Sequence, residues 1–400
     1  MEASYDILLG SKRLDAVPAS GIRKVMNRVA KLRGEGHSVI SFSAGEPGFN
    51  TPEPIKKAAI EALQNNMTHY ASNRGSLSLR TEIAGKIRED TGVVYDPETE
   101  LLVTCGGAEG INDCLLSVID PGDEVIILKP AFINYEALVR EIGAVPVDVN
   151  LDPGNGFQID LDAVERKISK RTKLLVFNSP NNPTGAVYRE EDLKGLVQLS
   201  EKYNFLLFSD EMYSCLTYEG KKFHSIAEIE GARDRCMIVN GFSKTYAMTG
   251  WRLGYVACPQ QLMEKIVKHH QYVTTSIATF LQEGMAKAMN LPETKEAVRK
   301  MQLQFARQRK AMLTGLDTIP SLSYVVPYGA FYVMVNVAGT GMDGETFSRE
   351  LLEKAYVATV PADCFGSVYD DYVRFSFAAK EEDIPEGIRR IREFLKYRKV

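Results

Sequence analysis

The sequence predicts a doubly wound α/β protein, in which helices cover both faces of a mostly parallel sheet. Short apolar runs that do not alternate with polar residues recur through the middle of the chain, and segments of helical periodicity separate several of them. Continuous apolar runs are typical of parallel strands buried on both faces, and alternating strands and helices indicate a parallel sheet. The chain has 400 residues, more than one core usually supports. We therefore expect a large domain and a smaller one.

The large domain is expected at residues 50–300, with its sheet between residues 101 and 257. Helical periodicity predicts helices at 135–142 and 190–203, between successive apolar runs. The strands are expected at 101–103, 123–128, 172–177, 205–208, 237–239 and 253–257.

The two ends of the chain, residues 1–49 and 301–400, are expected to form one small α+β domain. Thr51 and Pro52 predict a helix start, with Thr51 as N-cap and Pro52 at the first helical position. Helices are expected at 22–32 and 384–397, and strands at 331–335 and 372–377.

Composition restricts the kinds of partner that we expect. The net charge of −4 indicates neither a nucleic acid nor a membrane as partner, and there is no apolar run of about 18 residues. Residues 1–21 contain no signal-peptide core. The six scattered cysteines predict reduced thiols and a cytoplasmic protein, and the histidines show no metal signature. The rings of His269 and His270 should point in different directions on a helix.

Polar motifs follow the expected strands, where ligands bind in open α/β sheets. Gly106, Gly107 and Ala108 follow the first strand, where exposed N–H groups could bind an anion or simply form a tight turn. The segment 178–185 holds three asparagines and two prolines, which build either a turn or a stiff loop with an amide facing the cleft. Asp210 ends an apolar run, so its carboxylate should be partly desolvated unless it only caps a helix. Tyr213, three residues later, should share a helical face with Asp210.

Two basic residues stand out among apolar neighbours. Lys244 lies among small and aromatic side chains, with Arg252 two turns further on, which indicates a buried amine close to a phosphate-binding cation. Burial lowers the pKa of a lysine and makes it a nucleophile toward aldehydes, so this pattern predicts a Schiff base. Strand alternation places Arg374 on the opposite face of its strand from Val373 and Phe375. A half-buried arginine in this position could bind a carboxylate ligand or form a structural salt bridge.

The order and spacing of these motifs closely resemble the class I aminotransferases, which are pyridoxal 5'-phosphate enzymes of fold type I, and their aspartate-aminotransferase-like branch most of all. The resemblance runs from about residue 22 to the C-terminus and includes Ser43–Phe49 and Tyr70. It implies a three-layer large domain with a seven-stranded sheet, and a ping-pong transfer of the amino group of an L-amino acid to a 2-oxo acid. The motifs are Gly-Gly-Ala, Asn-Pro-Thr-Gly, Ser-Asp-Glu-x-Tyr, Ser-Lys, Trp-Arg and Val-Arg-Phe-Ser.

The resemblance also implies a role for each site residue. Lys244 carries the cofactor as a Schiff base, Asp210 faces its ring nitrogen, and Phe132 stacks on the ring. Asn182 and Tyr213 hydrogen-bond the phenolic oxygen of the cofactor. The cofactor phosphate binds to Gly107, Ala108, Ser243, Arg252 and, in a homodimer with composite sites, Tyr70 of the neighbouring subunit. Arg374, with Asn182 and the Gly45 backbone, binds the substrate α-carboxylate.

Other functions stay open. A carbon–sulfur β-lyase or a related lyase would use the same residues, and a non-catalytic binding protein could keep the fold. Some acid-specific bacterial relatives have lysine in place of Ala108, so its absence argues against an aspartate or glutamate substrate. Tyr135, Tyr328 and Phe331 could form an aromatic-tolerant pocket, or could simply pack in the core.

Overall fold

The computed structural model describes residues 11–396. Residues 1–10 of the N-terminal segment, and Tyr397 at the end of the expected last helix, lie outside this range. Three sheets are formed, of seven, four and two strands. In sheet order, the large sheet consists of β2 (Leu101–Thr104), β8 (Gly254–Ala257), β7 (Cys236–Gly241), β6 (Leu206–Asp210), β5 (Thr172–Asn178), β3 (Glu124–Lys129) and β4 (Val145–Asn150).

The large sheet is parallel except for β8, which runs antiparallel to both of its neighbours. The expected strands are all present, but the one at 253–257 therefore has the opposite direction to the others. The link from β7 to β8 contains only one short α-helix, and a short link of this kind favours the antiparallel return. β4 was not predicted, because it is an edge strand with only one buried residue and lacks an apolar run.

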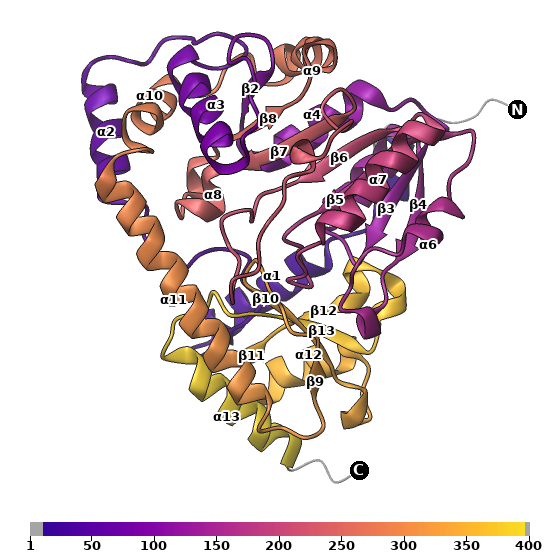
Figure 1. The fold of residues 1–400 in the computed structure, drawn as a ribbon. Helices are drawn as coiled ribbons and strands as arrows, with labels where there is room; N and C mark the ends of the chain where they lie inside the picture. The colour runs from indigo at the N-terminus through magenta and orange to yellow at the C-terminus, as the bar shows by residue number, and fades with distance from the viewer. Residues whose placement is uncertain (1–10, 397–400) are drawn as a thin grey trace, which may run out of the picture.

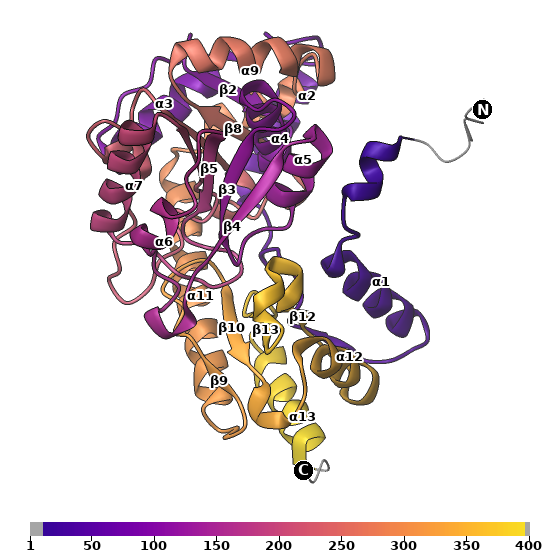
Figure 2. The same cartoon turned by 90° about the vertical axis from the view of Figure 1, so that its right-hand side faces the viewer.

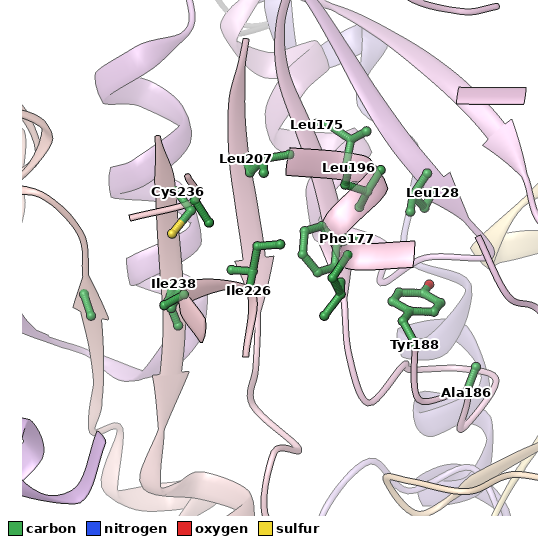
Figure 3. Packing of buried hydrophobic residues seen from close by; sticks show 14 of the residues in the cluster. Leu128, Leu175, Phe177, Ala186, Tyr188, Leu196, Leu207, Ile226, Cys236 and Ile238 are labelled. Atoms are coloured by element: carbon green, nitrogen blue, oxygen red, sulfur yellow. The ribbon is translucent and has the colours of Figure 1, made fainter. Parts of the chain in front are cut away.

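Helices cover both faces of the large sheet, which gives the three layers that the sequence predicts. One face packs on α4 (Gly106–Val118), α5 (Asn134–Ile142) and α9 (Gln260–Val273). The other face packs on α2 (Glu53–Gln64), α3 (Leu77–Thr91), α7 (Glu190–Tyr203) and α10 (Thr279–Ala288). Successive residues of β5 pack on opposite faces of the sheet. Leu175 and Phe177 lie in the core on the side of α2, α3, α7 and α10, and Leu174 and Val176 lie in the core on the side of α4, α5 and α9. Figure 3 shows part of the core on the α7 side, where Leu175, Leu207 and Ile238 from adjacent strands lie together.

The smaller sheets lie beside the carboxyl-end edge of the large sheet (Figures 1 and 2). The long helix α11 (Pro292–Leu316) runs along one side from the large sheet to the small ones (Figure 1). The four-stranded sheet has the order β12 (Val360–Pro361), β13 (Tyr372–Ser376), β10 (Tyr332–Asn336) and β9 (Ser323–Tyr324), and β1 (Ile40–Ser41) pairs with β11 (Val357–Ala358). The remaining α-helices are α1 (Gly21–Gly34), α6 (Leu161–Glu165), α8 (Phe242–Thr245), α12 (Gly344–Ala355) and α13 (Asp383–Lys396). Short 3-10 helices lie at Lys12–Ala16, Pro153–Asn155, Ile226–Glu228, Thr249–Trp251, Ala338–Thr340, Ala362–Phe365 and Ser367–Tyr369.

The predicted end helices and strands are present, with one wrong detail. Thr51 does not cap α2, whose N-cap is Pro52. The Thr51 hydroxyl instead donates to the carbonyl of Ala247 at 2.8 Å, so it ties the start of α2 to the segment after α8. The predicted domain boundary at residue 300 falls within α11, and the division of the chain into 50–300 and its two ends stays a prediction.

No helix within residues 11–396 combines the length and the apolar character that crossing a membrane requires. The six cysteines are free thiols, three of them buried.

Candidate active site

The predicted site residues converge on one cleft of about 370 Å³. It lies where β2, β5, β6 and β7 reach their carboxyl ends, because parallel strands present their final residues at one edge of a sheet. β13 of the small sheet supplies Arg374 from the other side. The predicted residues that line the cleft are Gly45, Gly107, Ala108, Phe132, Asn182, Asp210, Tyr213, Ser243, Lys244, Arg252 and Arg374.

Lys244 projects into this cleft from α8, the single helical turn that directly follows β7. Its Nζ donates to the carbonyl oxygen of Gly45 at 2.6 Å. Burial lowers the pKa of Lys244 to about 8, an effect that Arg252 and Arg374 reinforce and that Glu46 and Asp210 oppose. A substantial fraction of this amine is therefore neutral near physiological pH, which is the form that attacks an aldehyde.

Asp210 is the last residue of β6, and its carboxylate is buried. The Tyr135 hydroxyl donates to Oδ2 at 2.7 Å and the Met212 N–H donates to Oδ1 at 3.0 Å. Burial raises the pKa of Asp210, while these two hydrogen bonds and the charge of Lys244 oppose the rise. The residues after Asp210 form turns and no helix, so the predicted shared helical face with Tyr213 is wrong. The Tyr213 hydroxyl instead lies 3.0 Å from that of Tyr332.

Arg252 lies against the N-terminus of α4. Its guanidinium donates to the carbonyls of Thr249 at 3.0 Å and Cys105 at 3.4 Å. Gly106 has φ +72°, and a Cβ there would collide with the Arg252 guanidinium, so only glycine permits this approach. A cation at the positive end of a helix is unfavourable unless an anion joins them, so this arrangement is suited to a phosphate.

Arg374 is 1% exposed and lies in the middle of β13, with Val373 and Phe375 turned into the core of the small sheets as strand alternation predicts. Its two terminal nitrogens donate to Asn182 Oδ1 and to the Ser43 carbonyl, each at 2.9 Å. Its Nε has no hydrogen-bond partner in the part of the chain that the structure describes. The guanidinium also lies 4.4 Å from the centre of the Tyr332 ring. A buried guanidinium held this way is suited to a carboxylate ligand.

Five charged side chains of the cleft thus have no ion-pair partner within residues 11–396, namely Glu46, Asp210, Lys244, Arg252 and Arg374. The alternative of a structural salt bridge for Arg374 is therefore not supported. Asp210 and Arg374 are buried, Lys244 is partly buried and Arg252 is exposed. Buried charges without partners are costly, so the presence of these groups in one cleft indicates a ligand that pairs with them. A basic ring nitrogen, a phosphate and a carboxylate would pair with Asp210, Arg252 and Arg374 respectively, and an aldehyde would react with the neutral amine of Lys244. The cleft therefore fits pyridoxal 5'-phosphate together with an amino acid.

Several contacts of the site were not foreseen. Tyr135 supports Asp210, and Tyr332 lies between Tyr213 and Arg374, although nothing in their local sequence marks them. None of the three residues considered for an aromatic pocket, Tyr135, Tyr328 and Phe331, lines the cleft. Ile22 and Met26 of α1 do line it, as do Glu46 and Thr249, which share a hydrogen bond of 2.9 Å.

Tyr70 is the one predicted site residue that lies outside the cleft, with 86% of its surface exposed. Its predicted contact is with a neighbouring subunit, so this position agrees with the prediction without testing it.

A second polar cluster lies between α4 and α9. Glu109, Asp113 and His270 bring ligand atoms within 4.8 Å of one another, a set that could hold a metal ion. Nδ1 of His270 and Nε2 of His269 lie 3.0 and 3.5 Å from different oxygens of Asp113. The prediction that these two rings diverge is therefore wrong. The sequence shows no metal signature here, because the acids and the histidines lie on helices far apart in the chain.

Residues 37–391 match the family described as aminotransferase class I and II. The chain is 37% identical to aromatic-amino-acid aminotransferase 2 of Thermococcus litoralis and 38% identical to an aspartate aminotransferase of Pyrococcus abyssi. Each alignment covers 98% of this chain and 99% of the relative.

The fold has an equally close match among solved structures. Aspartate aminotransferase from Thermus thermophilus, determined with maleate, superposes with a TM-score of 0.92 at 37% identity. The match covers 96% of this chain and 99% of that one. The fold class that the sequence predicts is thereby confirmed.

Proposed function

The chain belongs to the class I and II aminotransferases, and on that premise we propose that it moves the amino group of an L-amino acid to a 2-oxo acid by a ping-pong reaction through a Schiff base of pyridoxal 5'-phosphate with Lys244. When bound, this cofactor supplies an aldehyde and a charged ring that withdraws electrons from the substrate α-carbon. The observation that carries the proposal is that Asp210, Lys244, Arg252 and Arg374 line one cleft and none of them has an ion-pair partner within the described residues.

Each of these residues has a task that its surroundings support. Asp210, held by Tyr135, keeps the cofactor ring nitrogen protonated. Arg252, Ser243 and the N-terminus of α4 at Gly107 and Ala108 hold the phosphate.

The remaining residues face the reacting end of the cofactor and the substrate. Phe132, Asn182 and Tyr213 line the cleft. Phe132 would cover the ring, and Asn182 and Tyr213 would bind its phenolic oxygen. Arg374, fixed by Asn182 and Ser43 and assisted by Gly45, binds the α-carboxylate. Lys244, once released from the aldehyde, is the base that moves the α-proton, since its lowered pKa leaves the amine partly neutral.

A homodimer with composite sites is part of the proposal. Tyr70 and Tyr272 are 86% and 84% exposed, so both are accessible to a second copy of the chain. In this arrangement Tyr70 reaches the phosphate site of its partner. The cytoplasmic location stays a prediction.

The test is a half-reaction with one amino acid and no 2-oxo acid. Transamination converts the bound cofactor to its amine form, loses the visible absorbance once, and releases one 2-oxo acid per site. Adding a 2-oxo acid should restore the absorbance. Continuous release of pyruvate, ammonia and thiol from cystathionine, without an acceptor, would instead identify a carbon–sulfur β-lyase. No spectral change with any amino acid would contradict both enzyme functions.

A further inference from the structure

We propose that a second cavity, which lies behind α8, binds a free amino acid as a zwitterion, with the ammonium group at Glu211 and the carboxylate at Lys221 and Lys222. This site is separate from the cleft, and the inference does not rest on the proposed function. A ligand bound there takes no part in the transfer of an amino group, so the chain has a second place at which it recognises an amino acid.

The second cavity has a volume of about 500 Å³. Its walls come from the end of α3, the segment 214–225, β7 and β8, and the start of α11. Thr245 and Tyr246 also line it, and they directly follow Lys244, whose side chain lines the cleft. Within residues 11–396 no residue lines both hollows. α8 therefore faces the cleft on one side and the second cavity on the other.

Glu211 is the charged group at the deep end of the second cavity, where it is only 4% exposed. Its Oε1 accepts hydrogen bonds from the hydroxyls of Ser209 and Ser225 at 3.1 and 2.9 Å and from the Ile226 N–H at 3.2 Å. Its Oε2 accepts none from the described residues, and neither oxygen has an ion-pair partner among them. A buried carboxylate without a cation is costly, so Glu211 favours a ligand that brings a positively charged N–H donor.

Two lysines supply the opposite charge at the mouth of the second cavity. Lys221 is half-buried and Lys222 is exposed, and neither has an ion-pair partner in the part of the chain that the structure describes. The remaining charged side chains of the lining pair with one another at 2.8 and 3.2 Å, Lys86 with Asp90 and Lys295 with Glu89. The lining thus has an unpaired carboxylate at one end and unpaired ammonium groups at the other. A zwitterion carries the two complementary charges.

The rest of the lining suits the uncharged part of an amino acid. Phe223 and Val298 offer apolar surface for carbon atoms. Polar groups there already bond to one another: Asn240 Nδ2 donates to Ser214 Oγ at 3.1 Å, and Cys215 Sγ lies 3.2 Å from Thr245 Oγ1. The lining therefore offers a small amino acid both apolar surface and polar groups along its length.

An alternative state of Glu211 needs no ligand. Burial raises the pKa of Glu211 to about 8, so in the empty cavity this carboxyl can hold a proton near neutral pH. An ammonium group would pair with the ionised form instead. The protonated state leaves Lys221 and Lys222 without a partner, whereas a bound amino acid pairs with both ends. The two states differ in whether an amino acid binds, which can be measured directly.

The test is calorimetric titration of the holoenzyme with proline. Proline has the two charges and N–H donors, but as a secondary amine it cannot take the place of Lys244 in a neutral Schiff base. We expect one proline per chain with a Kd of about 0.1–10 mM. Trimethylglycine has the same two charges and no N–H donor, so it should bind at least about ten-fold more weakly.

Variants at each end of the second cavity locate the bound proline. Glu211→Gln, which keeps the size of the side chain and removes its charge, should weaken proline binding by about ten-fold or more. The double variant Lys221→Ala with Lys222→Ala should weaken it by about three- to ten-fold. Lys170→Ala, which removes an exposed lysine outside the lining, should leave the Kd unchanged. The lysine variants lie at the mouth, so they decide the question even if Glu211→Gln does not fold.

Arg374→Ala separates the second cavity from the cleft, because the cleft would hold a carboxylate through Arg374. Proline binding should be the same in this variant as in the wild type. Loss of binding in Arg374→Ala, with normal binding in the double lysine variant, would place proline in the cleft and overturn the inference. Absence of binding to the wild type would also overturn it and would leave Glu211 as a protonated structural group. Equal binding of trimethylglycine would contradict the role of Glu211.

Discussion

The two ends of the cleft differ in the charge of the side chains that line them. At the edge of the large sheet, Asp210, Lys244 and Arg252 are held by backbone groups and Tyr135, and none of them has an ion-pair partner among the residues that the structure describes. At the α1 end, Ile22 and Met26 offer apolar surface. The difference indicates that the residues proposed to carry out the reaction lie at the carboxyl-end edge of the large sheet.

The largest effect is expected from the lysine at the sheet edge. Lys244→Ala should abolish transamination, with a loss of more than about a thousand-fold, since the base and the covalent attachment are both removed. Lys170→Ala, at an exposed position away from the cleft, is the matched control and should keep wild-type rates.

Lys244→Ala also tests whether Tyr70 of one subunit contributes to the active site of the other subunit. In a mixed dimer of Lys244→Ala and Tyr70→Ala, one site has both Lys244 from its own subunit and Tyr70 from the other. Mixing equal amounts of the two variants after mild denaturation should therefore restore up to about a quarter of the wild-type activity, because about half of the reassociated dimers are mixed and each of these has one complete site. Activity that stays at the average of the two variants would contradict the composite site.

Asp210→Asn should have the next largest effect. The amide keeps the size of the side chain but cannot keep the ring nitrogen protonated, so the half-reaction should slow by about a hundred- to a thousand-fold. Cofactor should still bind, because Arg252 and Lys244 are intact, and its visible absorbance reports this directly. Tyr135→Phe, which removes one hydrogen bond to Asp210, should produce a smaller loss in the same direction. A normal rate in Asp210→Asn would contradict its assigned task.

Arg374→Ala tests whether the α-carboxylate end is independent of the side-chain end. We expect KM to rise by about a hundred-fold for phenylalanine, methionine and aspartate alike, because every α-amino acid carries the carboxylate that Arg374 binds. Steady-state kinetics on the three substrates measure this. An effect confined to one substrate would mean that Arg374 recognises the side chain instead.

The smallest effect concerns pH. Burial lowers the pKa of Lys244 to about 8, so the neutral amine becomes more abundant as the pH rises toward 8. The rate of cofactor uptake by the cofactor-free protein should increase by up to about ten-fold per pH unit below 8 and level off above it. Stopped-flow absorbance measures this, and a rate independent of pH would mean that the amine is not the limiting nucleophile.

The same shift has a consequence for stability. Between pH 8 and 10.5 the unfolded chain holds a proton at position 244 that the folded chain has lost. The free energy of unfolding of the cofactor-free protein should therefore gain from this group as the pH rises through that window. Below pH 8 both states are protonated and the cost of burying the charge is present in full. Denaturation curves of the wild type and Lys244→Met should differ in this slope.

The sequence predicts the sheet edge better than the α1 end, for physical reasons. Runs such as Leu174–Phe177 are apolar because both faces of the strand are buried, so they are visible without a structure. β4 is missed because an edge strand need not be apolar. The hydrogen bond from Tyr135 to Asp210 joins residues that are 75 positions apart in the chain. Local sequence patterns do not predict contacts between residues so far apart. Helical periodicity predicts α1, but not that Ile22 and Met26 face the cleft, since this depends on how the helix is anchored.

The most direct test of the central claim is chemical. Borohydride reduction of the holoenzyme, followed by proteolysis and mass spectrometry, locates the covalent link between protein and cofactor. We expect the phosphopyridoxyl group on the peptide that contains Lys244, and on no other peptide. A label on a different lysine, or no label on a protein that shows the cofactor's visible absorbance, would contradict the assignment of Lys244 and with it the proposed reaction.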